Sequence, residues 1–174
     1  MLASQELIAA FNQQIGNEMG ASLLYVSIAS YFDGEALPQL ARFFYRQSEE
    51  EREHAMKFVK FVLDVEGAVA IPALPATQND FADAEGAVQT ALDSEKAVTD
   101  QIMELVEQAK EENNHFAHRF LDWFVDEQLE EVATMSSLLQ VLRRAGTGGL
   151  LHVEDYLART GGGPLDASGG GGGE

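Results

Sequence analysis

The chain has 174 residues, of which 45% are hydrophobic, and this is enough for one domain with an apolar core of its own. It contains no cysteine, which excludes a disulfide framework and a thiolate metal site. A formal net charge of −18 repels nucleic acid and anionic lipid, so we expect neither a nucleic-acid partner nor a membrane partner. The first residues lack the basic and apolar pattern of a secretory signal, and we expect a cytoplasmic protein.

Four long segments have the apolar spacing of amphipathic helices, over about residues 4–32, 38–66, 83–112 and 114–144. None of the four prolines interrupts this spacing. Ser4 is a suitable N-cap for the first helix, and Pro38 suits the first turn of the second. Gly34 and Gly146 follow the ends of the first and fourth segments. The pattern predicts an all-α protein.

The connection between the second and third helices is much longer than the others and contains Gly67, Pro72 and Pro75. It has about 16 residues and spans about 50 Å when extended, whereas a helix of about 28 residues is about 42 Å long. The connection can therefore cross the full length of a bundle. Short connections make the helices that they join antiparallel neighbours. The sequence predicts a four-helix bundle of two hairpins joined by one long crossover.

A short apolar segment, about residues 150–157, follows the fourth helix. It is too short to be stable alone, so we expect a fifth helix docked on another part of the protein. After Thr160 the chain is rich in glycine, and such a composition cannot bury a core. We therefore predict one domain over residues 1–160 and a flexible glycine-rich tail over residues 161–174.

Each long helix carries polar residues in the middle of its apolar stripe, namely Glu18, Glu51 with His54, Glu95 and Gln128. Carboxylates are almost never fully buried without a partner, because removing water from a charge is costly. A lone histidine on an apolar face is more often a hydrogen-bonded core residue. Because Glu18, Glu51 and Glu95 lie at the same depth as His54, we favour a metal ligand instead. The set predicts a dinuclear metal site, and its oxygen-rich composition suits iron or manganese.

Further residues of interest surround this predicted site. Tyr25 lies about two turns after Glu18 on the same face, where it could hydrogen-bond a ligand carboxylate or donate an electron. An ordinary core tyrosine would occupy the same place. The run from Asp126 to Glu131 is rich in acids, and a solvated helix face explains part of it. Glu127 and Glu131 lie four residues apart beside the apolar stripe, which also fits an outer cation site.

These residues resemble those of the non-haem bacterial ferritins, over about residues 4–160. The segments that carry the resemblance are Asn17-Glu18-Met19 with Tyr25, Glu49 to His54, Ser94-Glu95, and Asp126 to Glu131. The resemblance implies a ferritin-like fold and a hollow homo-oligomeric shell of twenty-four subunits. It also implies a ferroxidase that oxidises Fe(II) with dioxygen or hydrogen peroxide and stores the product as a ferric mineral, for iron storage and detoxification.

The resemblance also implies a role for each site residue. Glu18, Glu51 and His54 would hold the first iron, and Glu51 would bridge to a second iron held by Glu95, with Gln128 near it. The tyrosine beside this diiron centre would be Tyr25. The acids that would form a third iron site are Glu50, Glu127, Glu130 and Glu131. The fifth helix would line a four-fold axis of the shell.

Haem is not expected, because two residues depart from the pattern of the bacterioferritins. Arg52 stands where those proteins carry the haem-ligating methionine, and Glu130 stands where they repeat a histidine on the fourth helix. Two other functions remain open at this point. One is a diiron peroxidase or oxygenase of the same fold that acts on an organic substrate, and the other is a non-catalytic bundle used for binding or scaffolding.

Overall fold

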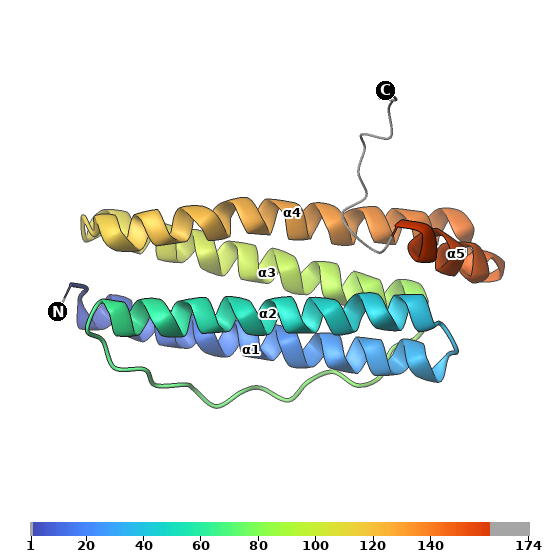
Figure 1. Ribbon diagram of the computed structural model, residues 1–174, viewed down its shortest axis with the longest axis horizontal. Helices are drawn as coiled ribbons and strands as arrows, with labels where there is room; N and C mark the ends of the chain where they lie inside the picture. The colour runs from blue at the N-terminus through green and yellow to red at the C-terminus, as the bar shows by residue number, and fades with distance from the viewer. Residues whose placement is uncertain (1, 161–174) are drawn as a thin grey trace, which may run out of the picture.

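The computed structural model describes residues 2–160, so the predicted glycine-rich tail lies outside the described residues. Four long helices form the bundle: α1 (Gln5–Gly34), α2 (Pro38–Asp64), α3 (Ala84–Glu111) and α4 (His115–Ala145). A short 3-10 turn, η1 (Thr147–Gly149), leads into α5 (Leu150–Thr160) at one end of the bundle (Figure 1). The predicted all-α four-helix bundle with a fifth helix is confirmed. Within the described part of the chain, no helix meets the length and apolarity that a membrane span requires.

The starts of three helices are capped by side chains. Ser4 Oγ accepts a hydrogen bond from the amide of Leu7 at 3.0 Å, as predicted, and Asp83 and Asn114 cap α3 and α4 in the same way. Gly146 follows α4 with a φ of 63°, a backbone region that glycine adopts without steric penalty. The predicted ends of the four long helices fall within about two residues of the observed ends.

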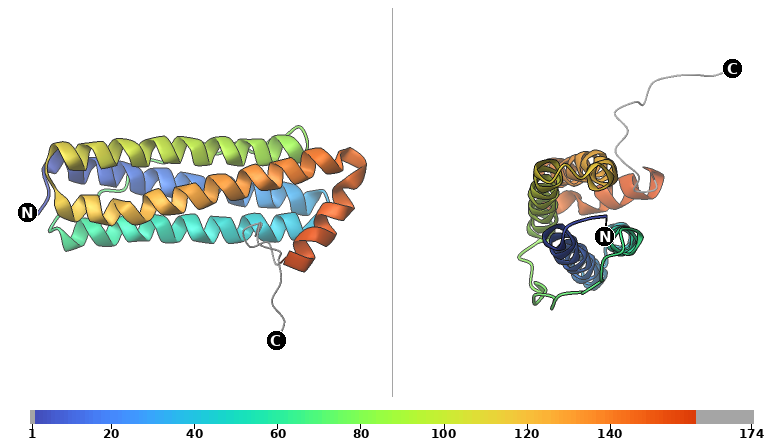
Figure 2. Two further views of the ribbon diagram at one scale, coloured as in Figure 1. Left: turned by 90° about the horizontal axis from the view of Figure 1, so that it is seen from above. Right: turned by 90° about the vertical axis from the view of Figure 1, so that its left-hand side faces the viewer.

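The crossover between α2 and α3 runs the length of the bundle beside α1, as its length predicted (Figures 1 and 2). The side chain of Asn12 holds its first part, because Nδ2 donates to the carbonyl of Ala68 at 2.9 Å and Oδ1 accepts from the amide of Ala70 at 3.0 Å. Farther along, Ser27 Oγ donates to the carbonyl of Gln78 at 2.7 Å. Both anchors belong to α1, so this helix fixes the course of the crossover.

The fifth helix docks on α2 and α4, and this confirms the prediction that it packs against another part of the protein. Val153 and Leu157 enter the apolar core, and the helix continues to Thr160. Its Glu154 is buried, and its two carboxylate oxygens accept the amides of Gln39 at 2.8 Å and Leu40 at 2.9 Å. The start of α2 has no side-chain cap of its own. Glu154 therefore supplies from α5 the acceptors that an N-cap residue would otherwise provide.

The apolar core consists of two separate clusters, one toward each end of the bundle. One contains Phe32 and Phe44, together with Val153 and Leu157 of α5. The other contains Phe11, Phe58 and Phe124, whose rings contact one another. Between the clusters, near the middle of the four long helices, lie the buried residues Glu18, Glu51, His54, Glu95 and Gln128. Val98, at the midpoint of α3, still belongs to the second cluster.

Candidate metal centre

The five predicted inward polar residues are all buried in the gap between the two apolar clusters. Their exposed fractions are 0% for Glu18 and Glu51, 1% for Glu95 and Gln128, and 3% for His54. The predicted burial is therefore confirmed for all five. In contrast, Glu53 on α2 is exposed. Their roles as ligands stay a prediction at this point.

Glu18, Glu51 and His54 form the tightest group. Each offers one ligand atom, and these three atoms lie within 4.8 Å of one another. His54 Nδ1 lies 3.4 Å from Glu51 Oε2, since the two residues are separated by one turn of α2. Glu18 Oε2, both carboxylate oxygens of Glu51 and His54 Nδ1 make no hydrogen bond with the described residues. Buried polar atoms normally have hydrogen-bond partners, so the position of these four atoms favours a cation held among them.

The electrostatics of this group favour the same interpretation. Burial raises the pKa of Glu18 well above its ordinary value, and the neighbouring charge of Glu51 raises it further. Burial likewise raises the pKa of Glu51, with a further contribution from Glu95. A cation among these oxygens would stabilise the ionised carboxylates and reverse both effects.

Glu95 is held by two neutral donors. The hydroxyl of Tyr25 donates to Glu95 Oε1, and Gln128 Nε2 donates to Glu95 Oε2 at 3.2 Å. Burial raises the pKa of Glu95, while these two hydrogen bonds oppose the rise. The pKa of Tyr25 is also raised, first by burial and then by the charge of Glu95. The structure thus brings Tyr25 and Gln128 together at one carboxylate, as the sequence suggested for Tyr25.

The acids of the predicted third site differ in their surroundings. Glu131 is buried, and burial together with the charges of Glu95 and Glu50 raises its pKa to about 8. Glu127 Oε1 lies 3.8 Å from His54 Nε2, which places it next to the buried group. Glu50 is exposed, and its carboxylate accepts a hydrogen bond from the side-chain Nε2 of Gln47. Glu130 is exposed, and its part in a metal site remains a prediction.

Two residues next to the centre were not predicted as part of it. Gln14 is buried, and its Nε2 donates to Glu18 Oε1 at 2.9 Å. The sequence signal that could have identified Gln14 is its position one turn before Glu18 on the same helix face. Trp123 is the other residue, and its ring makes an edge-to-face contact with the His54 ring at a centroid distance of 5.5 Å. The ammonium of Lys57 lies over the Trp123 ring, 4.3 Å from its centroid.

Comparison with known proteins decides the family. Residues 8–145 match the ferritin family, described as a ferritin-like domain. The chain belongs to the ferritin family. It is 44% identical over 151 residues to Ferritin BfrB of Mycolicibacterium smegmatis, covering 87% of this chain and 83% of that protein. It is 31% identical over 145 residues to a bacterial non-heme ferritin of Staphylococcus epidermidis, covering 83% of this chain and 87% of the relative.

Solved structures support the same membership. An open pore ferritin from the archaeon Archaeoglobus fulgidus superposes with a TM-score of 0.87 at 33% identity, covering 90% of this chain and 97% of that chain. The resemblance to bacterial ferritins and the ferritin-like fold are therefore confirmed. Family and fold together support iron storage as the general role of the chain.

Proposed function

We propose that this ferritin oxidises Fe(II) at a diiron ferroxidase centre inside each bundle and stores the product as a ferric mineral within a hollow shell. The observation that carries the proposal is the buried group Glu18, Glu51 and His54, with four ligand atoms that lack a partner among the described residues. Apolar clusters on both sides of the group keep bulk water away. Such a site suits cations that must bind, react and then leave.

In this proposal, the first Fe(II) binds to Glu18, Glu51 and His54. Glu51 bridges to a second Fe(II), which Glu95 holds with Gln128 beside it. Each Fe(II) gives one electron to the oxidant, dioxygen or hydrogen peroxide, and the carboxylates stabilise the higher charge of the ferric product. Tyr25 orients Glu95 through its hydrogen bond. The acids Glu50, Glu127, Glu130 and Glu131 form a third iron site.

A double substitution on α2 tests the centre directly. Glu51→Ala with His54→Ala removes three of the unpaired ligand atoms and should abolish the fast phase of aerobic Fe(II) oxidation, followed by the absorbance of ferric species. The matched control is Arg52→Ala with Glu53→Ala, because these residues are exposed on the same turn. The control should oxidise Fe(II) at the wild-type rate. An unchanged fast phase in the first variant would refute the ligand assignment.

The shell is tested separately by size. A homo-oligomer of twenty-four chains of 19.0 kDa would elute in size-exclusion chromatography at about half a megadalton. Leu151 on α5 is 74% exposed, and we expect this helix to contact other copies at the four-fold axis. Elution as a monomer or a dimer would instead favour the diiron peroxidase or oxygenase acting on an organic substrate.

A further inference from the structure

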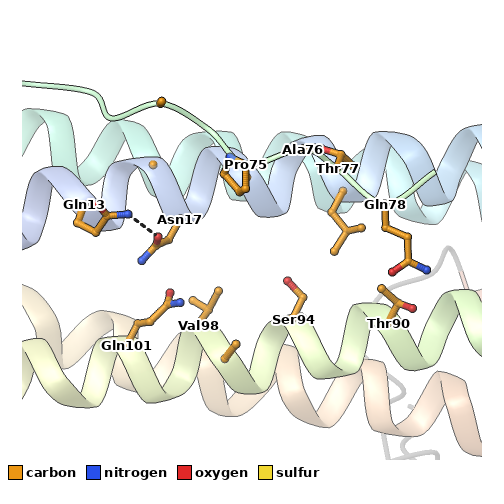
Figure 3. Close-up of a pocket in the computed structure, with 15 residues that line it drawn as sticks. Gln13, Asn17, Pro75, Ala76, Thr77, Gln78, Thr90, Ser94, Val98 and Gln101 are labelled. Carbon is orange, nitrogen blue, oxygen red and sulfur yellow. Dashed lines mark hydrogen bonds between the residues drawn. The ribbon is translucent and has the colours of Figure 1, made fainter. Parts of the chain in front are cut away.

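A pocket of about 320 Å³ lies between α1, α3 and the crossover (Figure 3). We call it the crossover pocket. Its polar lining consists of amide and hydroxyl side chains, among them Gln13, Asn17, Ser94 and Gln101. None of the described residues that line it carries an ionisable side chain, although the chain as a whole has a net charge of −18. The pocket is therefore uncharged, and its amide and hydroxyl groups stand among apolar residues such as Leu24 and Val98.

A row of amides connects the crossover pocket with the metal centre. Gln13 Nε2 donates to Asn17 Oδ1 at 3.1 Å, and Asn17 Nδ2 donates to Gln14 Oε1 at 2.8 Å. Gln14 Nε2 then donates to Glu18 Oε1 at 2.9 Å. Two hydrogen bonds thus separate the pocket wall at Asn17 from a carboxylate of the proposed centre. The row of amides thus gives a hydrogen-bonded connection between the pocket wall and the carboxylate of Glu18.

The opposite wall of the pocket offers an acceptor that is not used. Gln101 Oε1 is buried and makes no hydrogen bond with the described residues. Figure 3 shows its side chain extending from α3 toward the side of the pocket formed by Asn17. A buried carbonyl without a donor is unfavourable, so a molecule that carries an O–H group would be stabilised there. A volume of about 320 Å³ accommodates several molecules of the size of water.

We propose that the crossover pocket binds hydrogen peroxide and admits it to the diiron centre, while Fe(II) reaches the centre by another route. This inference rests on the proposed ferroxidase function. The described lining offers Fe(II) no carboxylate or imidazole ligand, so the pocket does not favour a cation. Hydrogen peroxide is neutral and both donates and accepts hydrogen bonds, so it matches the amide walls. Dioxygen has no O–H group to donate to Gln101.

The chemistry at the centre balances with this oxidant. Each of two Fe(II) ions loses one electron, and the O–O bond of hydrogen peroxide breaks as it takes up both electrons. The two oxygens leave as hydroxide ions, which become water after each takes up a proton. The pocket therefore needs to exchange only small neutral molecules and water, which fits its lining.

Filling the pocket from α1 tests the proposal. A Cβ at Gly20 would meet no atom within 4 Å, so Gly20→Leu should extend into the pocket without moving the backbone. The matched control is Gly34→Leu, because Gly34 lies on the same helix, has equal space and does not line the pocket. Stopped-flow absorbance would follow oxidation of Fe(II)-loaded protein mixed with hydrogen peroxide or with dioxygen. We expect Gly20→Leu to slow the peroxide reaction about ten-fold, with little change in the dioxygen reaction or in the control.

Two further variants separate the explanations. Ala97→Leu fills the pocket from α3 and replaces Gly20→Leu if that variant does not assemble. Gln101→Leu leaves the pocket open but removes the unused acceptor, and it should also slow the peroxide reaction selectively. Anaerobic titration with Co(II), followed by its visible absorbance, should show unchanged metal binding in all variants.

Each outcome bears on one proposal or the other. An unchanged peroxide rate in the filled variants would overturn the pocket assignment, and so would an equal loss with dioxygen. Weakened Co(II) binding in the filled variants would indicate a cation route and overturn it as well. A wild-type protein that neither binds Co(II) nor shows a fast oxidation phase would refute the proposed function itself.

Discussion

Glu131 should make the stability of the metal-free protein fall as pH rises. Its pKa is raised from 4.5 to about 8, mainly by burial and then by the charges of Glu95 and Glu50. Above pH 4.5 the unfolded chain loses this proton while the folded chain keeps it, so the stabilising contribution is complete at low pH and is lost as pH approaches 8. At about 1.4 kcal/mol per pH unit, the difference sets an upper limit of about 5 kcal/mol. The raised pKa values of Glu18 and Glu51 act in the same direction.

Thermal unfolding of metal-free protein between about pH 5 and pH 8.5 measures this effect. The Tm should fall across the range, and Glu131→Gln should flatten the dependence because its amide does not titrate. Glu130→Gln is the matched control, since Glu130 is exposed on the same turn and should leave the slope almost unchanged. Adding a divalent cation at pH 8 should restore the Tm of the wild type. A Tm that rises with pH, or equal slopes in the two variants, would contradict the reasoning.

Three further predictions concern contacts around the bundle and the centre. Glu154→Ala should lower the free energy of unfolding by about 1–3 kcal/mol in denaturant titrations, because two backbone amides of α2 lose their acceptor. The control Asp155→Ala, at an exposed residue of the same helix, should change it by less than about 0.5 kcal/mol. Gly16→Ala should lower the Tm because its Cβ would overlap the crossover, while Gly20→Ala should stabilise by up to about 1 kcal/mol. Tyr25→Phe should slow Fe(II) oxidation about ten-fold in stopped-flow measurements without loss of Co(II) binding, since it removes only a hydrogen bond to a ligand.

The fold and the candidate centre could be predicted largely because both depend on periodicity within single helices. Ser4 capped its helix as expected, and Glu18, Glu51 and Glu95 lie inside because each occupies the apolar stripe of its own helix. The length of the crossover allowed it to pass along the full bundle, as the structure shows. Such features need no knowledge of how distant segments meet.

Contacts between distant segments could not be predicted in the same way. Glu154 caps α2 across more than a hundred residues, and its sequence context is that of an ordinary helical acid. The Asn12 clamp on the crossover and the close approach of Pro72 to Gly16 also depend on where two elements come together. These contacts are set by packing, for which a single sequence carries no direct signal.

The proposed third iron site and the crossover pocket lie on different helices of the bundle. Glu50, Glu127, Glu130 and Glu131 belong to α2 and α4, whereas the pocket is lined by α1, α3 and the crossover. Because α3 also carries surface acids such as Asp100 and Glu104, the absence of charge is a property of the described pocket lining and not of that whole side of the bundle. The buried carboxylates lie between these two regions, and the apolar clusters supply the stability that the burial of so many polar groups would reduce. The proposed metal binding, the pH dependence and the proposed separate routes all depend on this one arrangement, a polar layer across the middle of an apolar bundle.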